Sequence, residues 1–135
     1  SKSREVYKGV LADYAKGVFQ GKIFVHPEAQ KTDGYQMNRA LLLSDKAEID
    51  SKPELEIYAD DVRCSHGATV GELEEEHLFY LKARGINAES ARRLLVEAYI
   101  GEVIDEIQSQ SIREALSKLA SDLLKKKLFE RSNER

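Results

Sequence analysis

The sequence predicts a mixed β plus α protein in which a strand-rich region precedes a smaller helical region. Up to Gly71, apolar residues alternate with polar ones in short clusters, which is the period of a half-buried strand. After Gly71, apolar residues recur every three or four positions, which is the period of an amphipathic helix. The change of period predicts a boundary at this glycine, with residues 1–71 as the β region and residues 72–135 as the helical region.

Short apolar clusters separated by turn residues define the expected strands. The clusters lie around Val6 and Val10, Val18 and Phe19, Ile23 and Val25, Leu41 to Leu43, Ile49, and Leu55 with Ile57. The residues expected to separate them are Gly17, Gly21, Asp33 with Gly34, Ser44 with Asp45, and Ser51 to Pro53. Strands this short and closely spaced are typical of a β-solenoid, a sandwich or a jelly roll. No strict repeat is visible, so the pattern does not choose among the three.

Three helices are expected after Gly71. Glutamates crowd the start of the first helix, where they complement the positive end of its dipole, and Gly85 is expected to stop it. Asn87 is expected to cap the second helix, and the capping-box pattern from Ser111 to Glu114 predicts the start of the third. The apolar stripe of the third helix consists of Ile112, Ala115, Leu116, Leu119, Leu123 and Leu128. Part of this apolar area should face the β region or a partner protein.

Length, composition and charge exclude several classes of function. A chain of 135 residues with 41% hydrophobic and 33% charged residues can build a core and is not a disordered segment. A net charge of −3 argues against nucleic acid or an anionic membrane as the main partner. No apolar run approaches the roughly 18 residues that a membrane span needs, so we expect no direct membrane insertion.

The termini and the cysteine content give two further expectations. The chain begins without methionine and enters patterned sequence at once, so we expect a piece of a longer protein. A single cysteine cannot form an intramolecular disulfide, which suits a reducing cytosol.

The pair Cys64 and His66 is the sharpest candidate for a functional site. Residues two apart on a strand project from the same face, roughly 6.5 to 7 Å apart. Thiolate and imidazole are the side chains that hold iron, iron–sulfur clusters, zinc or copper. A metal centre needs three or four ligands, so the others must come from elsewhere or from another chain. The alternative is that Cys64 packs as a small buried hydrophobe and His66 as a hydrogen-bonded interior residue.

Other polar motifs predict no chemistry. His26 precedes Pro27, which favours an extended, exposed position, and His77 lies in the glutamate-rich first helix as a solvated residue. Cys64 and His66 are too far apart on one strand face for the proton transfer that a catalytic Cys–His pair needs. Neither a G-x-x-x-x-G-K-[ST] loop nor G-x-G-x-x-G occurs, which excludes the usual nucleotide-binding loops. No catalytic residue is predicted.

Several long motifs resemble one family. The stretches that carry the resemblance are Gly21 to Val25, Ala29 to Gln36, Ala40 to Ser44, Pro53 to Gly71 and Leu78 to Ile86. They are similar to the C-terminal part of the SufB/SufD family. SufB proteins have a cysteine after the glutamine that matches Gln36, and acidic residues on both sides of the histidine that matches His66. Met37, Ser65 and Gly67 stand at those positions here, so the chain resembles the SufD branch.

This resemblance implies both a fold and a role. Residues 1–71 would be the last coils of a right-handed parallel β-helix, and residues 72–135 a helical domain. The role would be a non-catalytic scaffold subunit in iron–sulfur cluster assembly, paired with a SufB-type subunit and docked to a SufC-type ABC ATPase. His66 would contribute to a transient cluster shared with the partner subunit, with no cofactor expected in the isolated chain. Cys64 would be a second ligand, a redox-sensitive thiol or a packing residue. The resemblance implies the cytoplasm, or the stroma of an organelle.

Two rival functions follow from other readings of the same residues. The first is a cupin-like metalloenzyme that uses Cys64, His66 and His26 and would hold stoichiometric metal by itself. The second is an accessory subunit of a membrane transporter, since the partner is an ABC-type ATPase; the lack of a spanning or lipid-anchoring segment argues against it. An uncapped β-helix end would also expose strand edges, and such edges could pair between two copies of the chain to form a homo-oligomer.

Overall fold

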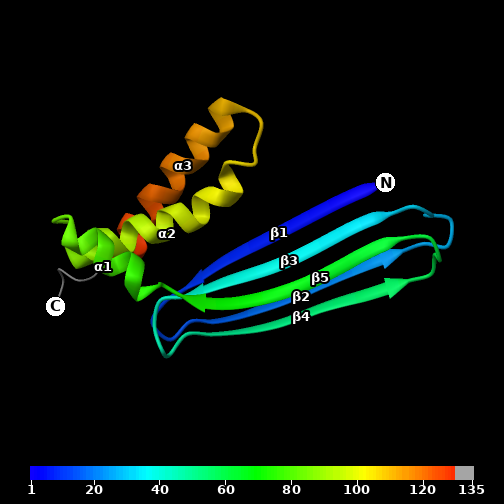
Figure 1. The fold of residues 1–135 in the computed structure, drawn as a ribbon, viewed down its shortest axis with the longest axis horizontal. Coiled ribbons are helices and arrows are strands. Elements are labelled where there is room, and N and C mark those ends of the chain that lie inside the picture. The colour runs from blue at the N-terminus through cyan, green and yellow to red at the C-terminus, as the bar shows by residue number, and fades with distance from the viewer. Residues whose placement is uncertain (130–135) are drawn as a thin grey trace. The chain divides into compact units, whose positions relative to one another are not determined.

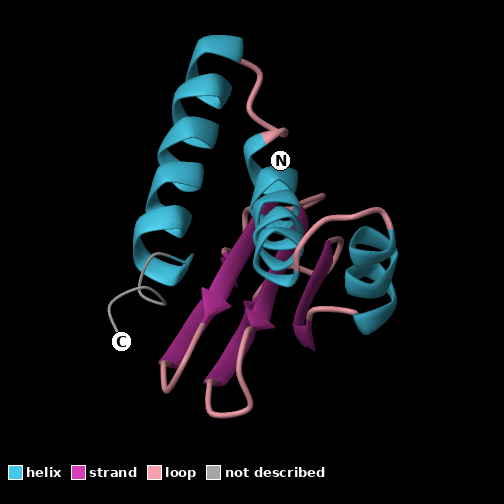
Figure 2. Ribbon diagram, turned by 90° about the vertical axis from the view of Figure 1, so that its left-hand side faces the viewer, coloured by secondary structure: helices cyan, strands magenta, loops and turns pink. Residues whose placement is uncertain are grey.

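The structure, a computed structural model, describes residues 1–129. The chain divides into two compact units, Ser1–Glu72 and Leu73–Arg135. The described strands belong to the first unit and the described helices to the second (Figure 2). The expected mixed β plus α class, with strands preceding three α-helices, is confirmed.

Two parallel sheets build the first unit. One sheet has the order β1-β3-β5, formed by β1 (Lys2–Leu11), β3 (Asp33–Leu42) and β5 (Arg63–Glu72). The other pairs β2 (Lys16–Val25) with β4 (Glu48–Ile57). Successive strands alternate between the two sheets (Figure 1). Residues about 30 positions apart therefore lie side by side, as Asp33 does with Arg63.

Parallel pairing corrects one expectation. In every described pair the strands run in the same direction, whereas jelly rolls, including cupins, and immunoglobulin-like sandwiches are built from antiparallel strands. The cupin-like rival is therefore wrong as a fold. Sequence pattern could not have excluded it, because side chains alternate with a period of two in both kinds of sheet.

A small apolar core lies where the sheets face each other. Leu11, Ala40 and Ala47 form its buried cluster, and Leu42 and Ile49 pack against it. The alternation of strand side chains explains this set, because Leu11 and Leu42 are register partners and Ala40 lies two residues before Leu42 on the same face. The core is thus built from one face of each sheet.

Most residues expected to separate strands lie inside them instead, and only Ser44 and Asp45 separate two strands as expected. Gly17 and Gly21 belong to β2, Asp33 and Gly34 begin β3, and Ser51 to Pro53 belong to β4. The two glycines of β2 make room for packing: a Cβ at Gly17 would lie 2.8 Å from a methyl group of Leu11 and 2.9 Å from one of Ile49. Proline is tolerated in β4 because this strand stands at the edge of its sheet. The expected breaks at Gly17, Gly21 and Pro53 were wrong for those reasons. The breaks expected at Asp33 with Gly34 and at Ser51 with Lys52 were also wrong, because these residues pair in parallel register with neighbouring strands.

Replacing Gly17 with alanine is expected to destabilise the first unit by about 1 to 3 kcal/mol, because the added methyl group overpacks the core. The atoms that must move are terminal methyl groups of Leu11 and Ile49, and because both side chains pack in the buried cluster, moving them disturbs its packing. Denaturant unfolding would measure the loss. Gly71→Ala is the matched control, since a Cβ there meets nothing within 4 Å. Equal stability of the two variants would contradict the packing argument.

The end of the first helix and the start of the second lie where the sequence indicates. Helix α1 (Glu75–Ala83) is followed by Gly85, whose φ of +89° is a left-handed conformation that glycine adopts without strain. Helix α2 (Ala88–Ile104) is capped by Asn87, whose side-chain oxygen accepts a hydrogen bond of 2.9 Å from the backbone N–H of Ser90. The expected stop at Gly85 and the expected cap at Asn87 are both confirmed.

The third helix begins earlier than its capping-box pattern indicates. Helix α3 (Gln110–Leu124) has Ser109 as its N-cap residue, so Ser111 lies in the first turn and the expected start was wrong. The Arg113 side chain explains the earlier start, because it donates hydrogen bonds to the backbone carbonyls of Ile107 and Gln108 and so ties the first turn to the preceding loop. A π-helical turn, η1 (Lys125–Phe129), follows α3.

Helix α3 has two apolar faces, and only one is buried. Leu124 is buried, and the Ser121 hydroxyl donates a 3.0 Å hydrogen bond to Glu97 of α2. The other face runs along the helix at steps of three and four residues. Its side chains are 37 to 54% exposed and comprise Ile112, Leu116, Leu119 and Leu123, hereafter the α3 stripe. The stripe therefore remains available for a partner.

Candidate metal-binding site

Strand β5 carries both predicted ligands on one face. Cys64 and His66 lie two residues apart within Arg63–Glu72, so their side chains leave the same side of the sheet. The register places Cys64 beside Gly34 and His66 beside Gln36 of β3. A Cβ built on Gly34 would lie 3.4 Å from the Cys64 sulfur, so this thiol shares the face on which such a Cβ would stand. Cys64 and His66 therefore share one face of the strand, as the alternation of the sequence predicts.

Accessibility differs between the two side chains. Cys64 is a half-buried free thiol and His66 is exposed. Within residues 1–129, no group of three or more His, Cys, Asp and Glu side chains could hold a metal ion. The pair is therefore at most part of a ligand set, and a metal or cluster bound here would need ligands from outside the described residues.

Two polar residues share a row with His66 across the sheet. Parallel register aligns Glu5 of β1 with Gln36 of β3, and Gln36 with His66 of β5. Gln36 is only 3% exposed, and its side-chain amide Nε2 donates a 3.1 Å hydrogen bond to a carboxylate oxygen of Glu5. Sequence reasoning missed this row. The signal that could have revealed it is the spacing of about 30 residues between successive members.

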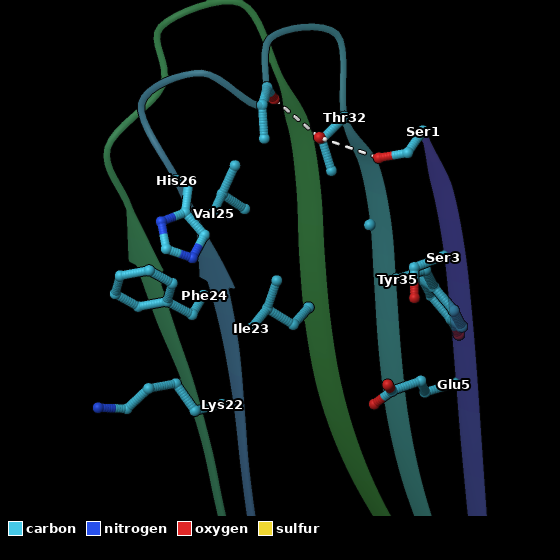
Figure 3. Close-up of a pocket in the computed structure, with 12 residues that line it drawn as sticks. Ser1, Ser3, Glu5, Lys22, Ile23, Phe24, Val25, His26, Thr32 and Tyr35 are labelled. Carbon is cyan, nitrogen blue, oxygen red and sulfur yellow. Dashed lines mark hydrogen bonds between the residues drawn. The ribbon is translucent and has the colours of Figure 1, made fainter.

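The other histidines lie in different surroundings. His26 is exposed at the end of β2, where its imidazole stands edge-on to the ring of Phe24 with centroids 4.7 Å apart (Figure 3). It lines a pocket of about 440 Å³ whose lining also includes Glu5 and Gly34 but neither Cys64 nor His66. His77 is exposed in α1, 3.5 Å from a carboxylate oxygen of Glu74. Neither joins a candidate metal cluster among residues 1–129.

A polar network occupies the outer face of the β2–β4 sheet. Glu56 accepts a 2.7 Å hydrogen bond from the Tyr58 hydroxyl and a 3.0 Å hydrogen bond from the Lys22 ammonium group. The hydrogen bond to Glu56 raises the pKa of Tyr58, and the bonds from Tyr58 and Lys22 lower the pKa of Glu56. Hydrogen bonding to Glu56 also raises the pKa of Lys22. The network joins β2, β4 and the start of the following loop.

Glu56→Ala is expected to lower the pKa of Tyr58 toward the ordinary phenol value of about 10, because the variant removes the carboxylate that holds the proton. In the unaltered chain the raised pKa contributes stability below about pH 10, and this contribution is lost as pH rises through the folded-state pKa. NMR of the Tyr58 ring carbon against pH measures the titration. Glu54→Ala, which removes only a carboxylate 3.8 Å from Lys22, should leave Tyr58 nearly unchanged; an equal fall would contradict the assignment.

Within residues 1–129, none of the helices is long and apolar enough to cross a bilayer.

Comparison with known proteins finds matches over most of the chain. Residues 1–99 match the family described as SUF system FeS cluster assembly, SufBD core domain. An iron–sulfur cluster assembly SufBD family protein of Synechocystis is 45% identical over 88% of this chain and 26% of its own length. Iron–sulfur cluster assembly protein SufD of Escherichia coli is 44% identical over 83% of the chain and 26% of its own length. The chloroplastic protein ABCI7 of Arabidopsis thaliana is 44% identical over 83% of the chain and 24% of its own length. The chain thus spans about a quarter of the length of these curated relatives.

Proposed function

Because the chain belongs to the SufBD core family of the SUF system for iron–sulfur cluster assembly, we propose that it is part of a SufD-like scaffold subunit. The match over residues 1–99 is the observation that carries this proposal. Two relatives whose names read SufD, from Escherichia coli and Bacillus subtilis, support the SufD branch, as do Met37, Ser65 and Gly67. The subunit is proposed to be non-catalytic, with ATP hydrolysis supplied by a partner.

The parallel strands are proposed to be coils of a longer right-handed β-helix. Strands that alternate between two parallel sheets, with pairing offsets of 30 to 32 residues, support this proposal. The greater length of the relatives supports it as well, since a solenoid buries its core by stacking successive coils.

A SufB-type subunit is the proposed partner of β5. This strand stands at the end of the order β1-β3-β5, and an unpaired strand edge is a ready site for another chain. Apolar side chains left exposed nearby, Leu55, Ile57 and Val70, give such a partner surface to cover. Across this junction His66 is proposed to act as a ligand of the nascent cluster, with Cys64 as a second ligand. The incomplete ligand set supports a shared site, in which the cluster is cargo of the complex.

A SufC-type ABC ATPase is the proposed partner of the α3 stripe. The stripe follows the helix for three turns and is lined by leucine and isoleucine, the arrangement that suits a helix laid into an apolar groove. Docking there would connect ATP hydrolysis to the scaffold without requiring any nucleotide-binding loop in this chain.

The cytoplasm, or a plastid stroma in a plastid-bearing organism, is the proposed compartment. A single cysteine, which is a free thiol, supports a reducing compartment. The chloroplastic relative of Arabidopsis supports the stromal variant.

Cluster assembly by a reconstituted complex tests the proposed function. The complete protein, a SufB-type subunit and a SufC-type ATPase would be combined without oxygen, with iron, a sulfide source and ATP, and cluster formation would be followed by absorbance. We expect a stable three-component complex that forms clusters several-fold faster than the same mixture without this protein. A complete protein that is folded but joins neither partner would refute the proposal.

A further inference from the structure

The side chain of Gln36 is held in one orientation inside the first unit. Its Nε2 donates to Glu5, and an ionised carboxylate can only accept hydrogen bonds, so the NH₂ group must face Glu5 and the oxygen must face away. Among residues 1–129, that oxygen, Oε1, is buried and has no hydrogen-bond partner. Leaving a buried acceptor unpaired costs about 1 to 3 kcal/mol, so an unpaired Oε1 calls for a donor.

Gly21 confines the amide from the facing sheet. A Cβ at this position would meet Gln36 Oε1 first and would lie 2.8 Å from the amide carbon and 2.9 Å from Nε2, so the whole amide, its oxygen included, lies against Gly21 in space that only glycine leaves open. Gln36 is thereby held between Gly21 and Glu5. Its Oε1 is a fixed acceptor.

His66 is the neighbour of Gln36 on the side away from Glu5. The two residues are register partners in adjacent parallel strands, which lie about 4.8 Å apart, and both side chains leave the same face. His66 is exposed, so its ring is free to turn without displacing the core. A neutral imidazole carries one N–H donor and one nitrogen lone pair, and a metal takes the lone pair.

We propose that Gln36 is a positioning residue for His66. Its Oε1 accepts a hydrogen bond from one ring N–H, which selects a single tautomer and directs the other ring nitrogen toward the shared cluster site. Glu5 secures this arrangement by fixing the amide of Gln36. The role toward a cluster rests on the proposed function of His66, whereas the hydrogen bond itself does not. Partners of this kind orient histidine ligands in many metal sites.

NMR of this chain labelled with ¹⁵N-histidine tests the hydrogen bond directly. The chain has three histidines, so His66→Ala identifies the His66 signals. At alkaline pH, where imidazoles are neutral, we expect His66 to populate one dominant tautomer with a protected ring N–H. Gln36→Met keeps the side-chain length but removes the acceptor, so the tautomer mixture of free histidine should return and the N–H protection should be lost.

Asn38→Leu is the matched control. Asn38 lies two residues along the same strand, is 5% exposed, and donates a 2.6 Å hydrogen bond to Ser51. It is the register partner of Ala68, so its loss removes a comparable buried amide and should leave the His66 tautomer unchanged. Glu5→Ala serves if Gln36→Met does not fold, because Glu5 is exposed; freeing the amide to flip should give an intermediate tautomer ratio.

Two results would overturn the inference. One is a free-histidine mixture for His66 in the unaltered chain, and the other is a single tautomer that survives both Gln36→Met and Glu5→Ala. Cluster assembly by the complete protein separates this inference from the proposed function. There we expect Gln36→Met to slow cluster formation by about 10- to 100-fold. If the tautomer depends on Gln36 while His66→Ala still forms clusters, the proposed ligand role fails and the hydrogen bond stands.

Discussion

Cluster formation by the reconstituted complex is expected to disappear in His66→Ala, while the complex itself still assembles. His66 is exposed, so its substitution leaves the apolar core in place, and losing the hydrogen bond proposed to Gln36 should lower the free energy of unfolding by only about 1 kcal/mol. Loss of the imidazole, in contrast, removes the proposed bond between His66 and the cluster, and no neighbouring side chain of this strand replaces it. Absorbance of the assembled cluster and the elution volume of the complex measure the two effects separately.

Ser65→Ala is the control for His66→Ala. Ser65 is also exposed on β5, but strand alternation places it on the opposite face. It should form clusters at the unaltered rate. If His66→Ala instead prevents the complex from assembling, His66 has a structural role at the junction, and if clusters form normally, His66 is no ligand.

ATPase binding is expected to fall at least about 100-fold when Leu116 and Leu119 are both replaced by glutamate. Two charges would then stand in the middle of the α3 stripe, and central apolar anchors of an interface commonly contribute about 2 kcal/mol or more each. Both side chains are already exposed, so the helix should remain folded. Calorimetric titration of the chain with the SufC-type ATPase measures the affinity, and circular dichroism checks the helix content.

Lys118→Glu is the matched control for the stripe. It introduces a carboxylate on the same helix, between the two leucines in sequence but about 100° around the helix from Leu119. Affinity should stay within a few-fold of the unaltered chain. An equal loss in both variants would mean that overall charge governs binding, and unchanged affinity in the double variant would place the docking surface elsewhere.

Local signals in the sequence predicted the class of fold and several helix ends. Period-two alternation before Gly71 and helical periodicity after it predicted strands followed by helices, and Asn87 and Gly85 marked their helix ends because caps act within one turn. The start expected at Ser111 was wrong because the helix begins before it, at Gln110, where the Arg113 side chain ties the first turn to the preceding loop. Gly17 was misread because it makes room for side chains of two other strands, Leu11 of β1 and Ile49 of β4, and strand pairing is not visible in the local sequence.

The site was predictable only in its local part. Strand alternation placed Cys64 and His66 on one face, since that geometry depends on two residues of one strand. Glu5 and Gln36 were missed as their neighbours because register between strands depends on pairing partners about 30 residues away. A strict sequence repeat would have revealed that register, but the strands share spacing without sharing residues.

The offset of about 30 residues between paired strands also bears on how quickly the two units fold. Each parallel ladder closes a long loop before any of its hydrogen bonds forms, as between Lys2 and Asp33. The backbone hydrogen bonds within each helix of the second unit join residues four apart and need no such closure. Chains dominated by non-local pairing fold in milliseconds to seconds, against microseconds to milliseconds for helical ones. During refolding, helical circular dichroism should therefore recover before the β1-β3-β5 sheet presents His66 in its row.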